Sequence, residues 1–305
     1  MSSRVLRVGT RGSALALAQS GMIADRVARM AGATVELVRI RTEGDVNTGP
    51  LATIGGTGVF VTGVREALLD GRADIVVHSY KDLPTAPTEG ITVAAVPERE
   101  SPYDALCARD GLRLDQLPRG STVGTGSPRR AAQLLARRPD LAVVPIRGNV
   151  DTRLRQVTEG HLDAVVLAAA GLNRLGRADA ITDVLDADRM LPAPAQGALA
   201  VECRSGADTW FTEATRTLDD APTRAAVVAE RVLLRDLEAG CSAPVGAFAQ
   251  VQGDALTLRA VVVAVDGGSE FRVHRAGSPA AAADLGALAA ADLIGQGAAG
   301  LLGAR

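Results

Sequence analysis

The sequence predicts an α/β protein with two similar domains around a cleft, followed by a small α+β domain. Three observations support this prediction. The chain has 305 residues, which exceeds the size of one typical hydrophobic core. Its first two-thirds repeat one order of strand, loop and helix. After residue 220 the pattern changes to a helix, several alternating strands and an alanine-rich helix.

The internal repeat is weak but ordered. Three pairs of segments match in sequence: Gly9–Ser13 with Gly124–Ser127, Ile40–Asp45 with Ile146–Asp151, and Gly71–Val77 with Gly160–Val166. The apolar runs Ile75–His78 and Ala164–Ala168 are short and uninterrupted, which is typical of parallel strands covered on both faces. The repeat therefore predicts two α/β domains of similar topology.

Two proline-bearing stretches are expected to join these domains, Val93–Pro102 on the way out and Leu191–Gly197 on the way back. The strand-like run Ala198–Cys203 then suggests a return to the first domain. A double crossover of this kind predicts a hinge beneath a cleft. We place the first domain at residues 1–97 and 198–218, the second at 102–191 and the third at 221–305.

The third domain is expected to begin with a helix over Thr223–Leu237. Its predicted strands are Val245–Gln252, Ala255–Val265 and Glu270–Arg275, and a helix ends it.

Composition excludes several classes of function. Aromatic residues make up 2% of the chain and the net charge is −2, which argues against a nucleic-acid binder. No apolar run approaches the roughly 18 residues of a membrane helix, so no membrane association is expected. Three distant cysteines indicate reduced thiols and a cytoplasmic protein. The three histidines and three cysteines have no zinc-like spacing, so no metal is expected.

Positive charge is concentrated in one stretch. Between residues 129 and 155 the chain has only two acidic residues, Asp140 and Asp151. The same stretch has seven arginines: Arg129, Arg130, Arg137, Arg138, Arg147, Arg153 and Arg155. Such local charge indicates a small polyanionic ligand.

The segment Val123–Arg130 gives this charge a site. It reads as a strand, a glycine turn, a hydroxyl at the helix N-cap, a proline at the first helical position and two arginines in the first turn. Backbone N–H groups, the helix dipole and two guanidinium groups would converge there on a carboxylate or phosphate. The alternative is that Arg129 and Arg130 are merely solvated, although a first-turn arginine opposes the helix dipole.

The segment His78–Pro84 follows a buried strand directly, so Lys81 and Asp82 are expected to face the cleft. A carboxylate beside an ammonium group there could guide a proton or stabilise a developing cation. The alternative is a loop ion pair or an aspartate turn before proline. His78 is expected to be a buried structural residue.

Cys241 is predicted to lie on a tight loop between Gly240 and Pro244. Cys107 and Cys203 lie in apolar runs, where cysteine is usually a small core residue. Cys241 is therefore the candidate reactive or modified thiol, the alternative being a partly buried loop cysteine. The glycine-rich segment Leu51–Val64 reads as a lid or as a simple connection.

Together these segments resemble the porphobilinogen deaminase family, also called hydroxymethylbilane synthases. The matching segments occur in the family's order and span nearly the whole chain: Gly9–Ser13, Val77–Pro84, Gly124–Arg130, Ile146–Arg153, Pro194–Ala198 and Gly240–Gly246.

The resemblance implies three domains, the first two like type II periplasmic binding proteins. It also implies a dipyrromethane cofactor, joined by a thioether to Cys241 and serving as a primer. Such a transferase of porphyrin and haem biosynthesis adds four porphobilinogen units head to tail with loss of ammonia, and hydrolysis then releases hydroxymethylbilane. A monomer acting on a small molecule is expected.

The resemblance also implies roles for single residues. Asp82 matches the catalytic aspartate, which assists proton transfer and stabilises positive pyrrole nitrogens. Residues matching those that bind acetate and propionate side chains, with their hydrogen-bonding neighbours, are Arg11, Ser13, Lys81, Thr125, Ser127, Arg129, Arg130, Arg147 and Arg153. The chain departs from many members at Thr57, where they have lysine, and at Gly126, where they have serine.

A second class of function explains part of the pattern. A non-catalytic two-lobed receptor or effector domain for anions would also have the hinge and the arginines. It would not explain a cysteine on a loop of a third domain, and its intact mass would lack a dipyrromethane adduct.

Overall fold

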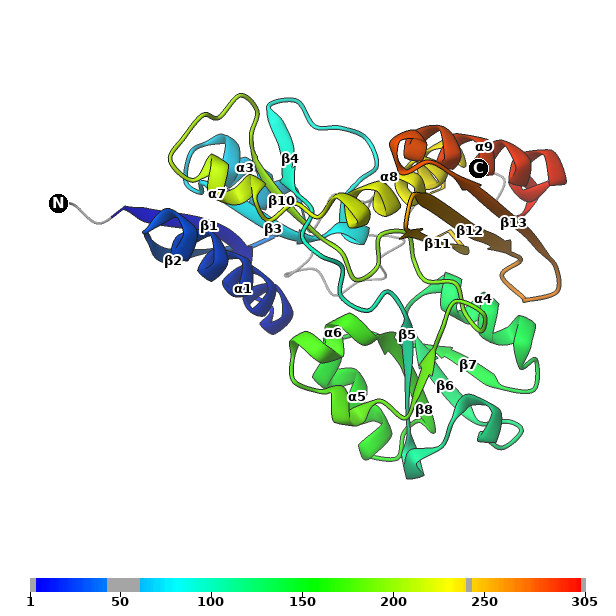
Figure 1. Cartoon of the computed structure of the whole chain (residues 1–305). Helices are drawn as coiled ribbons and strands as arrows, with labels where there is room; N and C mark the ends of the chain where they lie inside the picture. Colours follow the sequence, from blue (N-terminus) through cyan, green and yellow to red (C-terminus); the bar gives the residue numbers. More distant parts are fainter. Residues whose placement is uncertain (1–3, 43–60, 240–242, 303–305) are drawn as a thin grey trace. The chain divides into compact units, whose positions relative to one another are not determined.

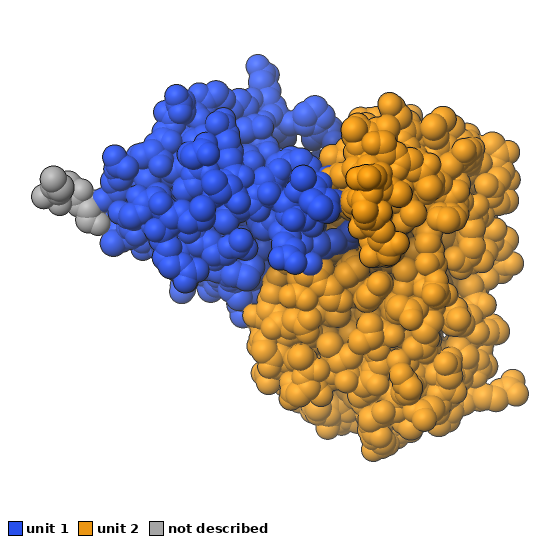
Figure 2. Space-filling view, viewed as in Figure 1, with its two compact units in different colours: residues 1–99, 198–224 blue, residues 100–197, 225–305 orange. Residues whose placement is uncertain are grey.

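A computed structural model describes residues 4–42, 61–239 and 243–302. The chain forms two compact units, shown in different colours in Figure 2. One consists of Met1–Arg99 and Ala198–Arg224, and the other of Glu100–Gly197 and Ala225–Arg305. No helix in the described ranges is long and apolar enough to cross a membrane.

The first unit contains a five-stranded sheet in the order β2-β1-β3-β10-β4 (Figure 1). Its strands are β1 (Val5–Arg11), β2 (Thr34–Ile40), β3 (Ile75–Ser79), β4 (Ile91–Ala95) and β10 (Leu199–Arg204). β1 is parallel to β2 and β3, whereas β10 is antiparallel to β3 and β4. The predicted return of the chain to the first sheet after the second crossover is thus confirmed.

Among the described residues of this unit, three helices accompany the sheet: α1 (Ala14–Ala31), α3 (Thr62–Leu69) and α7 (Thr212–Arg216). Ser13 caps α1 by accepting a hydrogen bond from the Ala16 N–H at 3.3 Å, and Gly32 ends the helix with a φ of 62°. The apolar face of α1 packs on β1 and β3, with Ile23, Val27 and Ile75 fully buried.

The second unit contains a sheet in the order β7-β6-β8-β5-β9. Its strands are β5 (Asp104–Ala108), β6 (Thr122–Thr125), β7 (Ala142–Pro145), β8 (Ala164–Ala168) and β9 (Asp183–Leu185). The helices are α4 (Pro128–Arg137), α5 (Val150–Thr158) and α6 (Ala169–Arg174).

The first and second sheets have the same plan. In each, the third strand in the order is parallel to the second and antiparallel to the fourth. The fourth strand is β10 in one sheet, which follows the returning crossover, and β5 in the other, which follows the outgoing one. This shared topology confirms the two similar α/β folds that the internal repeat predicted.

A third, antiparallel sheet consists of β11 (Val245–Gln252), β12 (Ala255–Val263) and β13 (Glu270–Gly277). It is accompanied by α8 (Ala221–Asp236) and α9 (Ala282–Gln296), and Leu233, Leu258 and Leu293 are fully buried in their common core. The predicted elements of the small α+β region are confirmed.

The second and third sheets belong to one compact unit because they share contacts. Ala132 of α4 and Leu191 are buried in one cluster with Val261 of β12. Glu230 of α8 is fully buried and accepts hydrogen bonds from the backbone N–H groups of Ala195, at 2.5 Å, and of Ala249, at 2.7 Å. The limits of the three separate domains given above stay a prediction.

Candidate functional site

The start of α4 has the predicted capping. Ser127 accepts a hydrogen bond from the Arg130 N–H at 3.4 Å, and Pro128 occupies the first turn. The Ser127 N–H in turn donates to Thr125 Oγ1 at 3.2 Å, at the end of β6. A strand, a hydroxyl-bearing turn and the positive end of a helix dipole therefore meet here, which favours an anion.

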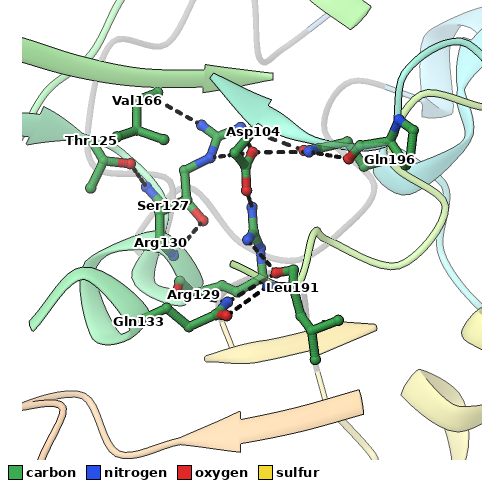
Figure 3. Close-up of polar contacts among 10 residues, drawn as sticks. Asp104, Thr125, Ser127, Arg129, Arg130, Gln133, Val166, Leu191 and Gln196 are labelled. Carbon is green, nitrogen blue, oxygen red and sulfur yellow. Dashed lines mark hydrogen bonds and ion pairs between the residues drawn. The ribbon is translucent and has the colours of Figure 1, made fainter. Parts of the chain in front are cut away.

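The two first-turn arginines lie in the interior rather than on the surface. Arg129 is 3% exposed and Arg130 is 6% exposed. Both pair with Asp104, the first residue of β5, which is completely buried (Figure 3). The sequence had suggested either a ligand or solvent as their partner, and it did not reveal Asp104.

Backbone carbonyl groups complete these contacts. Arg129 Nη1 donates to the Leu191 carbonyl at 2.6 Å, and Arg130 Nη1 donates to the Val166 carbonyl at 3.0 Å (Figure 3). Burial lowers the pKa of Arg129, the charge of Asp104 opposes this shift, and the charge of Arg130 adds to it. The interior therefore disfavours the charged form of Arg129, and the Asp104 carboxylate offsets part of this cost.

One donor in this cluster has no acceptor in the described part of the chain. It is the Arg129 Nε, which is buried. Leaving a buried donor unpaired costs about 1–3 kcal/mol, and more when it is charged. A carboxylate ligand is the kind of group that would satisfy it, so this observation fits the acetate and propionate groups of a dipyrromethane.

Arg147 and Arg153 extend the positive charge toward the loop before α5. Arg153 Nε donates to the Gly148 carbonyl at 2.9 Å. Burial lowers the pKa of Arg153, and the positive charges of Arg130 and Arg147 lower it further. All three influences disfavour the charged guanidinium, and a bound anion would offset them.

Gly126 leaves the space in which this loop lies. A Cβ atom at Gly126 would lie 2.8 Å from the Ile146 carbonyl oxygen and 3.7 Å from Arg153 Nη2. The first distance is shorter than real Cβ contacts, so a side chain here requires a backbone shift. Glycine therefore allows the turn after β7 to approach the start of α4 closely.

In the first unit, the candidate residues lie at the carboxyl ends of parallel strands. Arg11 ends β1, and Ser13 caps the helix that follows it. Lys81 and the exposed Asp82 lie in a short 3-10 helix directly after β3. Because β1 and β3 are parallel, these residues share one edge of the sheet, where ligands of open α/β sheets bind.

A second buried acid, Glu202 of β10, lies within this sheet. Arg65 donates to it through Nη2 at 2.6 Å and through Nε at 2.9 Å. His78 Nε2 lies 3.3 Å from Glu202 Oε2, and His78 is buried as predicted. Burial alone would raise the pKa of Glu202, but the contacts with His78 and Arg65 lower it to about 2.

The remaining predictions concern the three cysteines and Thr57 of the glycine-rich segment. Cys107 of β5 and Cys203 of β10 are buried free thiols, as expected of core cysteines, and burial raises the pKa of Cys107 to about 12. Cys241 and Thr57 lie outside the described residues. Shortly after Cys241, the Ala247 N–H donates to the Pro192 carbonyl at 2.8 Å, next to Leu191 and its contact with Arg129.

Comparison with known proteins decides the family. Residues 6–212 match the family model described as porphobilinogen deaminase, dipyromethane cofactor binding domain. Residues 224–295 match the model described as porphobilinogen deaminase, C-terminal domain. The chain belongs to the porphobilinogen deaminase family.

Curated relatives agree over the full length. Porphobilinogen deaminase of Thermobifida fusca is 56% identical, over 98% of this chain and 96% of that protein. Porphobilinogen deaminase 1 of Streptomyces coelicolor is 54% identical, over 100% and 99%. Among solved structures, the methionine-binding protein MetQ aligns with a TM-score of 0.45 and 14% identity, covering 70% of this chain and 89% of that one.

Proposed function

We propose that this chain performs the porphobilinogen deaminase reaction with Asp82 in proton transfer, the arginines of the second unit in carboxylate binding and Cys241 as the point of cofactor attachment. The family makes the chain a transferase of tetrapyrrole biosynthesis with a dipyrromethane-binding domain. The reaction joins four porphobilinogen units head to tail, with release of ammonia, and ends in hydrolysis to hydroxymethylbilane. When bound, the dipyrromethane supplies the primer for this condensation.

The arginine cluster carries the proposal. Each pyrrole bears two carboxylates, so a growing chain accumulates negative charge that must be neutralised with directional bonds. Planar guanidinium groups do this better than ammonium groups. The charges of Arg130 and Arg147 lower the pKa of Arg153, and the buried Arg129 Nε has no acceptor among the described residues. Thr125 and Ser127 are assigned to hydrogen bonds beside them.

In the first unit, Asp82 is assigned to proton transfer as the amino group leaves. Its place directly after a buried parallel strand supports this role, because such positions are fixed by the sheet and open to a ligand. Arg11, Ser13 and Lys81, at the same edge of the sheet, are assigned to substrate or cofactor carboxylates.

Cys241 is assigned to the thioether partly by the state of the other thiols. A thiolate is the nucleophilic form of cysteine, and burial raises the pKa of both Cys107 and Cys203. We further infer a cytoplasmic monomer that acts on porphobilinogen without nucleic acid or membrane. Reduced, buried Cys107 and Cys203 support that compartment.

The test is the intact mass of denatured protein. Wild-type protein should carry an adduct of dipyrromethane size, and Cys241→Ala should be folded, inactive and without it. Cys107→Ala and Cys203→Ala serve as matched controls that should keep the adduct. An adduct retained on Cys241→Ala would refute the attachment site.

A further inference from the structure

We propose that Asp104 is a positioning residue that holds the guanidinium groups of Arg129 and Arg130 in the orientation needed to bind a ligand carboxylate. The inference rests on the proposed assignment of Arg130 to such a carboxylate. Asp104 touches no reacting atom in this account. It acts through the two arginines.

The contacts of Asp104 are shared between both guanidinium groups. Oδ1 accepts from Arg130 Nε at 2.9 Å and pairs with Arg130 Nη2 at 2.8 Å. Oδ2 pairs with Arg129 Nη2 at 2.8 Å (Figure 3). Two contacts along one edge fix the plane of a guanidinium group, so the carboxylate sets the orientation of Arg130.

Within the described part of the chain, the orientation leaves one N–H donor of Arg130 for a ligand. Besides its contacts with Asp104, Arg130 donates through Nη1 to the Val166 carbonyl at 3.0 Å and through Nη2 to Gln196 Oε1 at 3.4 Å. A guanidinium group has five N–H donors, and these four contacts do not use all of them. The positive charge of Arg130 also lowers the pKa of Arg153, so Arg130 contacts the buried carboxylate and influences the rest of the cationic cluster.

Asp104 is itself held in place by the returning crossover. Gln196 Nε2 donates to Asp104 Oδ1 at 2.9 Å and to the Pro102 carbonyl at 2.8 Å. Residues 102 and 196 belong to the two stretches by which the chain enters and leaves the second sheet. The carboxylate is therefore fixed at a point where both stretches meet, and a fixed acceptor is what a positioning role requires.

Positioning and simple charge balance predict opposite results. If Asp104 were only a counter-ion, its removal would increase the positive potential and tighten the binding of an anion. If Asp104 orients the arginines, its removal frees two guanidinium groups to rotate, and anion binding weakens despite the added positive charge. The direction of the change in affinity therefore separates the two roles.

The experiment compares Asp104→Asn with Asp183→Asn in the full chain. Asp183 is a matched control because it is also a buried strand acid of the second unit, paired with Arg189 at 2.8 Å. Each variant is tested for thermal unfolding, for cofactor loading by intact mass after incubation of cofactor-free protein with porphobilinogen, and for kcat and KM. Both variants should unfold at lower temperature.

Asp104→Asn should load less cofactor and show a KM raised by about 10–100-fold, the value of one charge-assisted hydrogen bond, with kcat of the loaded fraction changed little. Asp183→Asn should keep wild-type loading and KM. Wild-type loading and KM in folded Asp104→Asn would overturn the proposal, and so would tighter binding.

Two further variants keep the outcome decisive. If Asp104→Asn does not fold, Gln196→Met removes the support of Asp104 while keeping the carboxylate. It should raise KM by a few-fold, and an unchanged KM would count against the proposal. Arg130→Gln tests the underlying assignment separately. Normal loading and KM in Arg130→Gln would refute the role of Arg130, whereas impaired Arg130→Gln beside normal Asp104→Asn would refute only the positioning.

Discussion

Each of the two similar sheets contains a buried acid on its antiparallel fourth strand, and each acid pairs with arginine on a neighbouring helix. In the first sheet Glu202 of β10 pairs with Arg65, and in the second Asp104 of β5 pairs with Arg129 and Arg130. The two acids lie at different positions along the strands of their sheets. Asp104 lies opposite Ala168, the last residue of β8, whereas Glu202 lies opposite Val76, near the start of β3.

This difference indicates that the buried acid–arginine pair has a different role in each sheet. At the carboxyl edge of the second sheet, the acid fixes arginines that belong to the candidate ligand site. Deeper in the first sheet, the acid ties β10 to β3 and α3 beneath an edge where Asp82 is exposed. We therefore expect Glu202 to govern stability and the edge residues to govern activity.

The largest effect is expected at the edge of the first sheet. Asp82→Asn should lower kcat by about 10²–10⁴-fold, because it removes a positioned proton-transfer group. Its melting temperature should stay near that of the wild type, since Asp82 is exposed. Steady-state kinetics together with thermal unfolding measure both quantities, and Asp82→Glu should retain part of the activity. Wild-type turnover in Asp82→Asn would show that Asp82 shapes the loop and takes no part in catalysis.

A comparable free energy, expressed in stability rather than rate, is expected for Glu202→Gln. Breaking a buried ion pair leaves Arg65 uncompensated, which typically costs about 3–5 kcal/mol. Denaturant unfolding should report this loss, while KM of the folded variant should stay at the wild-type value. A raised KM in the folded variant would make the two buried acids equivalent and break the comparison.

The pH dependence of the unfolding free energy should report the contribution of the Glu202 carboxylate. The folded-state pKa of Glu202 is lowered from 4.5 to about 2, so its contribution is complete above pH 4.5 and is lost as the pH falls toward 2. The shift corresponds to roughly 3 kcal/mol. Urea unfolding from pH 6 to pH 2 should therefore show a decline that is smaller in Glu202→Gln. Equal declines in both proteins would contradict the lowered pKa.

A smaller effect is expected at Gly126. A Cβ atom there would lie 2.8 Å from the Ile146 carbonyl, and overpacking of this kind costs about 1–3 kcal/mol. Gly126→Ala should lower stability and raise KM by a few-fold. The loop of Ile146 and Gly148 would have to move, and the Gly148 carbonyl accepts a hydrogen bond from Arg153. The exposed Gly12, with no neighbour within 4 Å of its Cβ position, provides the control Gly12→Ala for stability. Unchanged stability and KM in Gly126→Ala would show that the loop shifts without cost.

Local features of the fold were predictable because they depend on residues that are close together in the sequence. The cap Ser127, the buried run Ile75–His78 and the return of the chain through β10 follow from short patterns. The paired acids were not predicted. Asp104 and Glu202 stand in apolar strands, which is the one signal they give, but their arginines lie 26 and 137 residues away. Helix position alone predicted Arg129 and Arg130 to point at a ligand or solvent.

The central claim is that Arg130 of α4, which pairs with Asp104, binds ligand, whereas Arg65 of α3, which pairs with Glu202, stabilises the fold. The most direct test is the KM for porphobilinogen, with cofactor loading by intact mass, of Arg130→Gln beside Arg65→Gln. Arg130→Gln should lose loading or show a KM raised by about 10–100-fold. Arg65→Gln should melt earlier, yet load fully and keep the wild-type KM. Equal KM values in the two variants would contradict the claim.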